Sequence, residues 1–331
     1  MLDVKMWPAA VAAVAVLSAV PASDIQPSLR ELLARELRFS SAALADLEKG
    51  KVVALDLHES APGTIGAVGA VKVKARRADL VDRYRDIERF KRGADVMQIG
   101  KFGNPPTADN LAPLVLDKED VDLRGCRLRD CDIRLPAAII GRIPRGVDSA
   151  AFFKQVLFEN VTAYLSGGAD RIVEYDDQKQ PVRPVDDFNA LLAGAPYLDR
   201  LMPGLRDHLR EYPAAPLAGA ENFLYWSKEK FGITPFVTVT HVTIAPPAAD
   251  YAVITSKDVY SSRYFDASLT VTIASDSTGS ADAFYLVYVN RSRASALKGA
   301  LAGLRRSIVE RRAINALEQN LAVVKRRLES P

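Results

Sequence analysis

The sequence predicts an α+β protein in which an antiparallel sheet is covered by a long C-terminal helix. Strand-like runs cluster late in the chain, between residues 233 and 290, and a shorter strand, strand, helix series lies early in it. The final segment, 294–328, has apolar residues mainly three and four positions apart, the spacing of one helix face. Such a helix needs an apolar surface to cover, and the sheet directly before it is the nearest one.

The composition is that of a soluble globular protein. Hydrophobic residues make up 48% of the chain, charged residues make up 26%, and the formal net charge is +3. This charge is too close to neutral to indicate nucleic acid as a partner.

The first 22 residues read as a secretory signal peptide. Lys5 supplies a basic start, and the apolar run from Trp7 to Val20 is short for a membrane span. Val20 and Ala22 place small residues at the −3 and −1 positions of a cleavage site. The sequence therefore predicts a periplasmic or secreted protein that begins near residue 23, and an uncleaved N-terminal anchor is the alternative.

The region 23–102 is expected to contain N-terminal helices and the first part of the sheet. Leucines at helical spacing predict a helix over 27–38, and Ser40 or Ser41 can cap a second short helix. The remaining elements expected here are strands over 51–58, 63–75 and 96–102 and an amphipathic helix over 77–91.

The region 103–232 is predicted to be mainly α-helical. Asp148 can cap a helix that runs to Gly167, and a second helical block over 185–212 is broken at Pro196 and Pro203.

Cys126 and Cys131, the two cysteines of the chain, lie close together in this region. In an oxidising compartment such a pair predicts a local disulfide, and two buried thiols are the alternative. A metal site is not expected, because the spacing lacks a second pair of ligands and no histidine lies nearby.

The region 233–331 is predicted to form the antiparallel strands and the C-terminal helix. Strands are expected over 233–244, 251–259, 267–274 and 283–290. Arginines and lysines make the final helix basic, which predicts peripheral contact with anionic lipid headgroups. Interleaved glutamates favour the alternative of a solvated face with ion pairs along the helix.

The stretch VKVKARRADLVDRYRDIERFK, with Asp86 near the end of its helix, is similar to the strand-to-helix entrance of the START-like, or helix-grip, superfamily. The resemblance covers residues 51–102 and 233–328. It implies that 103–232 is an insertion and that a ligand cavity lies between the concave face of the sheet and the C-terminal helix.

No catalytic residue is predicted. The sequence lacks the common nucleophile, metalloprotease, dinucleotide and phosphate-loop motifs, and the three histidines, His58, His208 and His241, are scattered along it. No motif indicates a cofactor. The superfamily that the chain resembles includes enzymes, but nothing in the residues supports catalysis.

The expected cavity is apolar, with few polar groups. Val237, Val239 and His241 are predicted to line one wall, and His241 would be the single polar group able to orient a ligand. The opposite wall is expected to be formed by residues of the C-terminal helix, with aromatic residues near the mouth. The helix residues are Leu301, Leu304 and Ile308, and the aromatic ones are Trp226 and Tyr264.

Two functions of different classes follow from these patterns. The favoured one is an exported binding or carrier protein for a lipid or another apolar small molecule. The alternative is a cell-envelope structural or interaction protein with a solid core and no ligand.

Overall fold

The computed structural model describes residues 23–230, 234–298 and 302–330. It shows an α+β architecture with an eight-stranded antiparallel sheet, and it confirms that the C-terminal helix packs on this sheet. The order of the strands is β1-β2-β8-β7-β6-β5-β4-β3, which is compatible with a helix-grip-like arrangement. The strands are β1 (Val53–Asp56), β2 (Thr64–Val73), β3 (Val96–Lys101), β4 (Glu221–Glu229), β5 (Phe236–Ile244), β6 (Tyr251–Ser261), β7 (Ala267–Ser277) and β8 (Ser280–Arg293).

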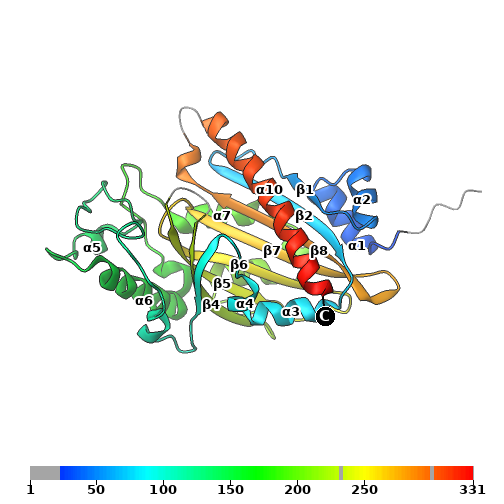
Figure 1. Cartoon of the computed structure of the whole chain (residues 1–331), viewed down its shortest axis with the longest axis horizontal. Coiled ribbons are helices and arrows are strands. Elements are labelled where there is room, and N and C mark those ends of the chain that lie inside the picture. Colours follow the sequence, from blue (N-terminus) through cyan, green and yellow to red (C-terminus); the bar gives the residue numbers. More distant parts are fainter. Residues whose placement is uncertain (1–22, 231–233, 299–301, 331) are drawn as a thin grey trace, which may run out of the picture.

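One face of the sheet carries α3 (Arg77–Arg85), α4 (Ile87–Phe90) and α10 (Ala302–Glu329). Figure 1 shows α10 lying across β1, β2 and β8, with α3 and α4 near its C-terminal end. The helix contacts the sheet through Leu317, Leu321 and Leu328, which are buried against β2 and its neighbours. We call this the α10 face.

The opposite face is covered by the N-terminal helices and by the helices between β3 and β4. Two large apolar cores lie on this side, one under α1, α2, α7, α8 and α9 and one under α6. We call this the α6 face. Its helices are α1 (Pro27–Glu31), α2 (Ser41–Glu48), α5 (Ala137–Ile140), α6 (Ser149–Gly167), α7 (Pro184–Ala193), α8 (Leu198–Leu201) and α9 (Leu205–Glu211).

Local signals in the sequence predicted most of these elements. Asp148 caps α6 through its carboxylate, which accepts hydrogen bonds from the backbone N–H groups of Ala150 and Ala151. Ser40 caps α2 in the same way. The helical block over 185–212 is divided into α7, α8 and α9, as the two prolines predicted.

Two boundaries differ from the expectation. The helix expected over 27–38 is α1 followed by a π-helical turn over Leu32–Glu36. The region 103–232 is not helical to its end, because residues 221–229 form β4, which pairs with β3 on one side and with β5 on the other. In that strand Phe223 and Tyr225 lie on the α10 face and Trp226 on the α6 face, and the density of aromatic residues concealed the period of two.

Candidate functional site

The structure places Val237, Val239 and His241 on the α6 face, so the prediction that they face α10 is wrong. Val237 and Val239 pack against α6, whereas Val242 from the same strand belongs to the core under α3 and α10. Successive residues of a strand point to opposite faces of the sheet. Because Val242 faces α10, the odd-numbered residues beside it in β5 face away from that helix.

The opposite wall predicted on the C-terminal helix is also absent. Leu304 and Ile308 are 63% and 46% exposed and belong to none of the buried clusters. Leu301 lies outside the described residues. The helix meets the sheet through its C-terminal half instead, and a Leu304→Trp replacement would extend into solvent rather than fill a chamber.

Trp226 does not lie at a cavity mouth. It is 1% exposed and its indole N–H donates to the backbone carbonyl of Asn110 at 2.9 Å, within the core under α6. Tyr264 lies in the turn between β6 and β7, where its hydroxyl donates to the carbonyl of Thr234 at 3.0 Å.

The α10 face is polar where the helix leaves it uncovered. The pairing register places Ser256, Thr270 and Asn290 side by side across three strands, and Asn290 in turn pairs with Ala67 in the core under α10. Residues that pair directly point to the same face of a sheet. We call the following set the polar strip: Thr240, Ser256, Asp258, Thr270, Tyr288 and Asn290.

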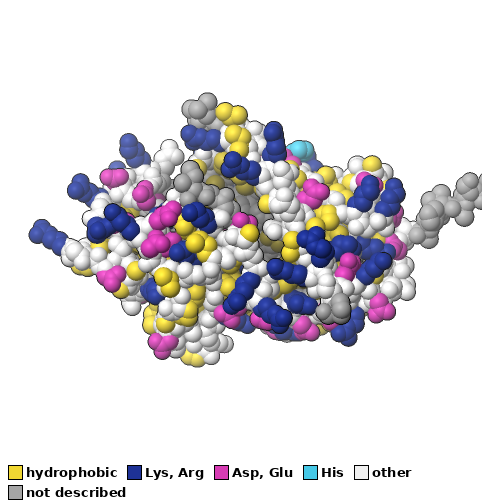
Figure 2. All heavy atoms as spheres, viewed as in Figure 1, with side chains coloured by type: hydrophobic (Ala, Val, Ile, Leu, Met, Phe, Trp, Pro, Cys, Tyr) yellow, Lys and Arg dark blue, Asp and Glu magenta, His cyan; other side chains and the backbone are white. Residues whose placement is uncertain are grey.

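The polar strip is accessible to solvent and internally hydrogen-bonded. All of its members except Thr240 are partly exposed. Asn290 donates from Nδ2 to the hydroxyl of Thr270 at 3.0 Å, and Thr270 lies 3.4 Å from the hydroxyl of Tyr288. Figure 2 shows the surface hollowed beside α10 in the same view of this face. The polar strip therefore presents hydroxyl, amide and carboxyl groups to solvent on this face.

Asp258 is the carboxyl group at the centre of the polar strip. Its Oδ1 accepts a hydrogen bond from Thr240 at 2.9 Å, and within the described residues it forms no ion pair. Burial raises the pKa of Asp258 to about 7, and the Thr240 hydrogen bond opposes this only in part. A carboxyl group that can gain or lose its proton near neutral pH, in a hollow of the surface, is typical of functional sites.

An ion pair lies beside Asp258 where α4 ends. The ammonium of Lys91 lies 3.2 Å from Glu229 and donates to the hydroxyl of Tyr225 at 3.0 Å. Burial acts to lower the pKa of Lys91, but the Glu229 carboxylate and Tyr225 raise it well above its ordinary value. The two charges of this pair offset each other, so Asp258 remains the acid without a basic partner.

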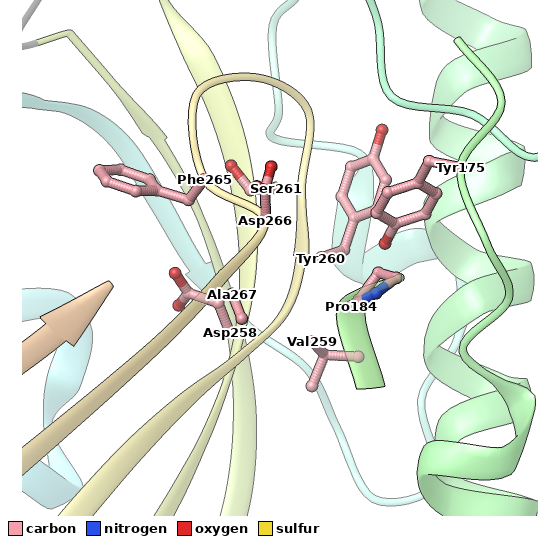
Figure 3. A pocket seen from close by; sticks show the side chains of 9 residues that line it. All are labelled: Tyr175, Pro184, Asp258, Val259, Tyr260, Ser261, Phe265, Asp266 and Ala267. Atoms are coloured by element: carbon pink, nitrogen blue, oxygen red, sulfur yellow. The ribbon is translucent and has the colours of Figure 1, made fainter. Parts of the chain in front are cut away.

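Figure 3 shows the Asp258 carboxylate on the opposite side of β6 from Val259, Tyr260 and Tyr175. Asp258 lines a small pocket together with residues of the end of β6 and with Tyr175, and this pocket has room for little more than a water molecule. The pocket is therefore not a ligand site.

A second polar cluster is buried on the α6 face. The Oδ1 atom of Asn222 accepts hydrogen bonds from His208 at 3.1 Å and from His241 at 3.0 Å, and His241 lies 2.9 Å from the hydroxyl of Tyr164. His208 and His241, which are far apart in the sequence, thus meet across β4, β5 and α9, whereas His58 is exposed and lies 2.7 Å from Asp56. Burial lowers the pKa of His241 to about 3, and this keeps it neutral.

Lys257 lies in the same buried cluster. It is 2% exposed, donates from Nζ to the carbonyl of Leu209 at 2.9 Å, and lies over the ring of Phe188. Burial lowers its pKa to about 7. The cluster joins helices of the α6 face to the sheet, and its groups are enclosed rather than presented to solvent.

Cys126 and Cys131 form a disulfide, as their closeness in the sequence predicted. In the part of the chain that the structure describes, no three His, Cys, Asp or Glu side chains are grouped so that they could hold a metal ion. No helix in that part is both long and apolar enough to span a membrane. Comparison of the chain with models of protein families and with curated proteins finds no match.

Proposed function

We propose that this protein is an exported binding protein that holds a small molecule carrying hydroxyl or amino groups on the polar strip. The observation that carries the proposal is Asp258, an acceptor without a basic partner, in a row of hydroxyl and amide groups that solvent can reach. Sites for small molecules combine a hollow with a few converging polar groups. The polar lining favours such a ligand over the lipid that an apolar chamber would suit.

The proposed arrangement is helix-grip-like, with residues 103–220 as an insertion between β3 and β4. The order of the strands supports this arrangement. β2, the strand before α3, pairs with β8, the strand before α10. The insertion would then cover the α6 face and leave the hollow on the α10 face open.

Export is proposed from the signal-like segment that precedes residue 23. Asp24 hydrogen-bonds to Lys72, Tyr285 and Ser277, so the contacts of the first described residues with the sheet would remain after cleavage behind Ala22. We expect protein recovered from the cell envelope to have a mass that begins at Ser23. Soluble cytoplasmic protein with an intact Met1 would contradict export.

Native mass spectrometry of protein purified from the envelope tests the binding function. We expect a mass in excess of the polypeptide that disappears on denaturation, because a ligand held by several hydrogen bonds should survive gentle purification. The same spectrum tests the alternative, a cell-envelope interaction protein with a solid core, which would show the polypeptide mass alone.

Matched threonine replacements locate the ligand. Thr270→Val removes a hydroxyl of the polar strip and should reduce the ligand-bound fraction, whereas Thr255→Val removes a buried hydroxyl that has no hydrogen-bond partner. Thr255 pairs with Val271, which lies in the core of the α6 face, so this control leaves the strip intact. Equal loss of ligand in both variants, or in neither, would contradict binding at the polar strip.

A further inference from the structure

The N-terminal half of α10 presents an apolar pair to solvent. Leu304 and Ile308 are one turn apart and are 63% and 46% exposed. Leu317 and Leu321 of the same helix are buried against the sheet. Counting about 100° per residue, Leu304 and Ile308 lie about 140° and 180° around the helix from Leu317. This pair therefore faces away from the sheet and from the polar strip.

Arginines flank the exposed pair. Arg305, Arg311 and Arg312 are exposed, and none of them forms an ion pair with another described residue. Arg306, by contrast, pairs with Glu310 on the side of the helix that faces the protein. Figure 2 shows the dark blue side chains of Lys and Arg along α10. The outer face thus combines two exposed aliphatic side chains with three uncompensated positive charges.

We propose that this outer face of α10 docks on a lipid bilayer that contains anionic phospholipid. Aliphatic side chains on a basic helix can enter the boundary between headgroups and acyl chains, while the guanidinium groups bind lipid phosphates. Positive side chains near an anionic surface each add to the attraction, and the three arginines supply the complementary charge. Because the face is one convex helix surface without a groove, it fits a broad planar partner.

The docking does not depend on the proposed ligand. The docking side chains belong to α10, whereas the polar strip belongs to β5, β6, β7 and β8, so each can be altered without changing the other. A failure of ligand binding therefore leaves this proposal standing, and the reverse also holds.

Co-sedimentation of the purified chain with vesicles tests the proposal. We expect binding to vesicles of phosphatidylcholine with phosphatidylglycerol, little binding to phosphatidylcholine alone, and release as NaCl is raised from about 0.1 M to about 1 M. A Leu304→Ser, Ile308→Ser double variant should bind about tenfold more weakly, and so should an Arg311→Gln, Arg312→Gln variant.

Val115→Ser with Leu128→Ser is the matched control. These residues are 66% and 53% exposed, so the control removes similar apolar surface from a different part of the molecule. It should bind the anionic vesicles as well as the unmodified protein does. No binding to anionic vesicles, or equal weakening by the control, would overturn the proposal. Association of the purified chain with an acidic protein, but not with anionic vesicles, would also overturn it.

Discussion

Replacing Lys257 with Met is expected to stabilise the protein at pH 7, by about 1 to 3 kcal/mol. The folded chain keeps this lysine at a pKa of about 7, against an ordinary value of 10.5, because it is buried. Between these values the unfolded chain binds a proton that the folded chain does not, so stability falls as the pH decreases from 10.5 to 7. The penalty at pH 7 is about 4 kcal/mol, and the unpaired Leu209 carbonyl of the variant offsets about 1 to 3 kcal/mol of the gain.

Urea unfolding of the two proteins at different pH values measures this effect. The advantage of Lys257→Met should shrink by about 3 kcal/mol when the pH is raised from about 7 to about 9.5, since less of the penalty remains there. Lys118→Met, at a lysine whose side chain is 75% exposed, should change little with pH. A constant difference between Lys257→Met and the unmodified protein would mean that Lys257 is charged in the folded state.

Replacing Asp258 with Asn is expected to raise stability above pH 7 and to abolish ligand retention. Burial raises the pKa of this carboxyl group from 3.8 to about 7. Between these values the folded chain holds a proton that the unfolded chain has lost, so the stability contributed by this group falls as the pH rises. Because Asp258 is partly exposed, solvent screening reduces the effect to about 2 kcal/mol.

The Asp258→Asn advantage should vanish near pH 4, where the carboxyl group is protonated in the folded chain. Asp282→Asn, at an exposed position on β8, is the control and should show no such dependence. If the stability gain of Asp258→Asn grew toward low pH instead, the pKa of Asp258 could not be raised in the folded chain. If the Asp258→Asn variant retained its ligand in full, Asp258 would not take part in ligand binding.

Local patterns predicted the elements better than they predicted the faces. Leu269 and Val271 alternate with polar residues along β7, a pattern typical of a half-buried strand, yet only Thr270 and Asp276 of this strand are partly exposed. In the structure this apolar side packs under the N-terminal helices and α7 rather than under α10. Both faces of the sheet are covered, and periodicity within one strand does not show which helix lies on which face.

The site was missed for the same reason. Thr270 alternates with apolar residues like the solvent side of an ordinary strand, yet it pairs with Asn290 on the face that carries α10. Asp258 occupies a strand position next to a bulge between β5 and β6, which no turn residue marks in the sequence. The disulfide needed only two nearby cysteines and was predictable, whereas the polar strip depends on the register of four strands.

A crystal structure of protein purified from the envelope tests most directly whether the polar strip holds a ligand. We expect electron density for an organic molecule on the α10 face, within hydrogen-bond distance of Asp258 and in contact with Thr270 or Asn290. Density for ordered water alone along the polar strip, or a ligand enclosed between α6 and the sheet, would contradict it.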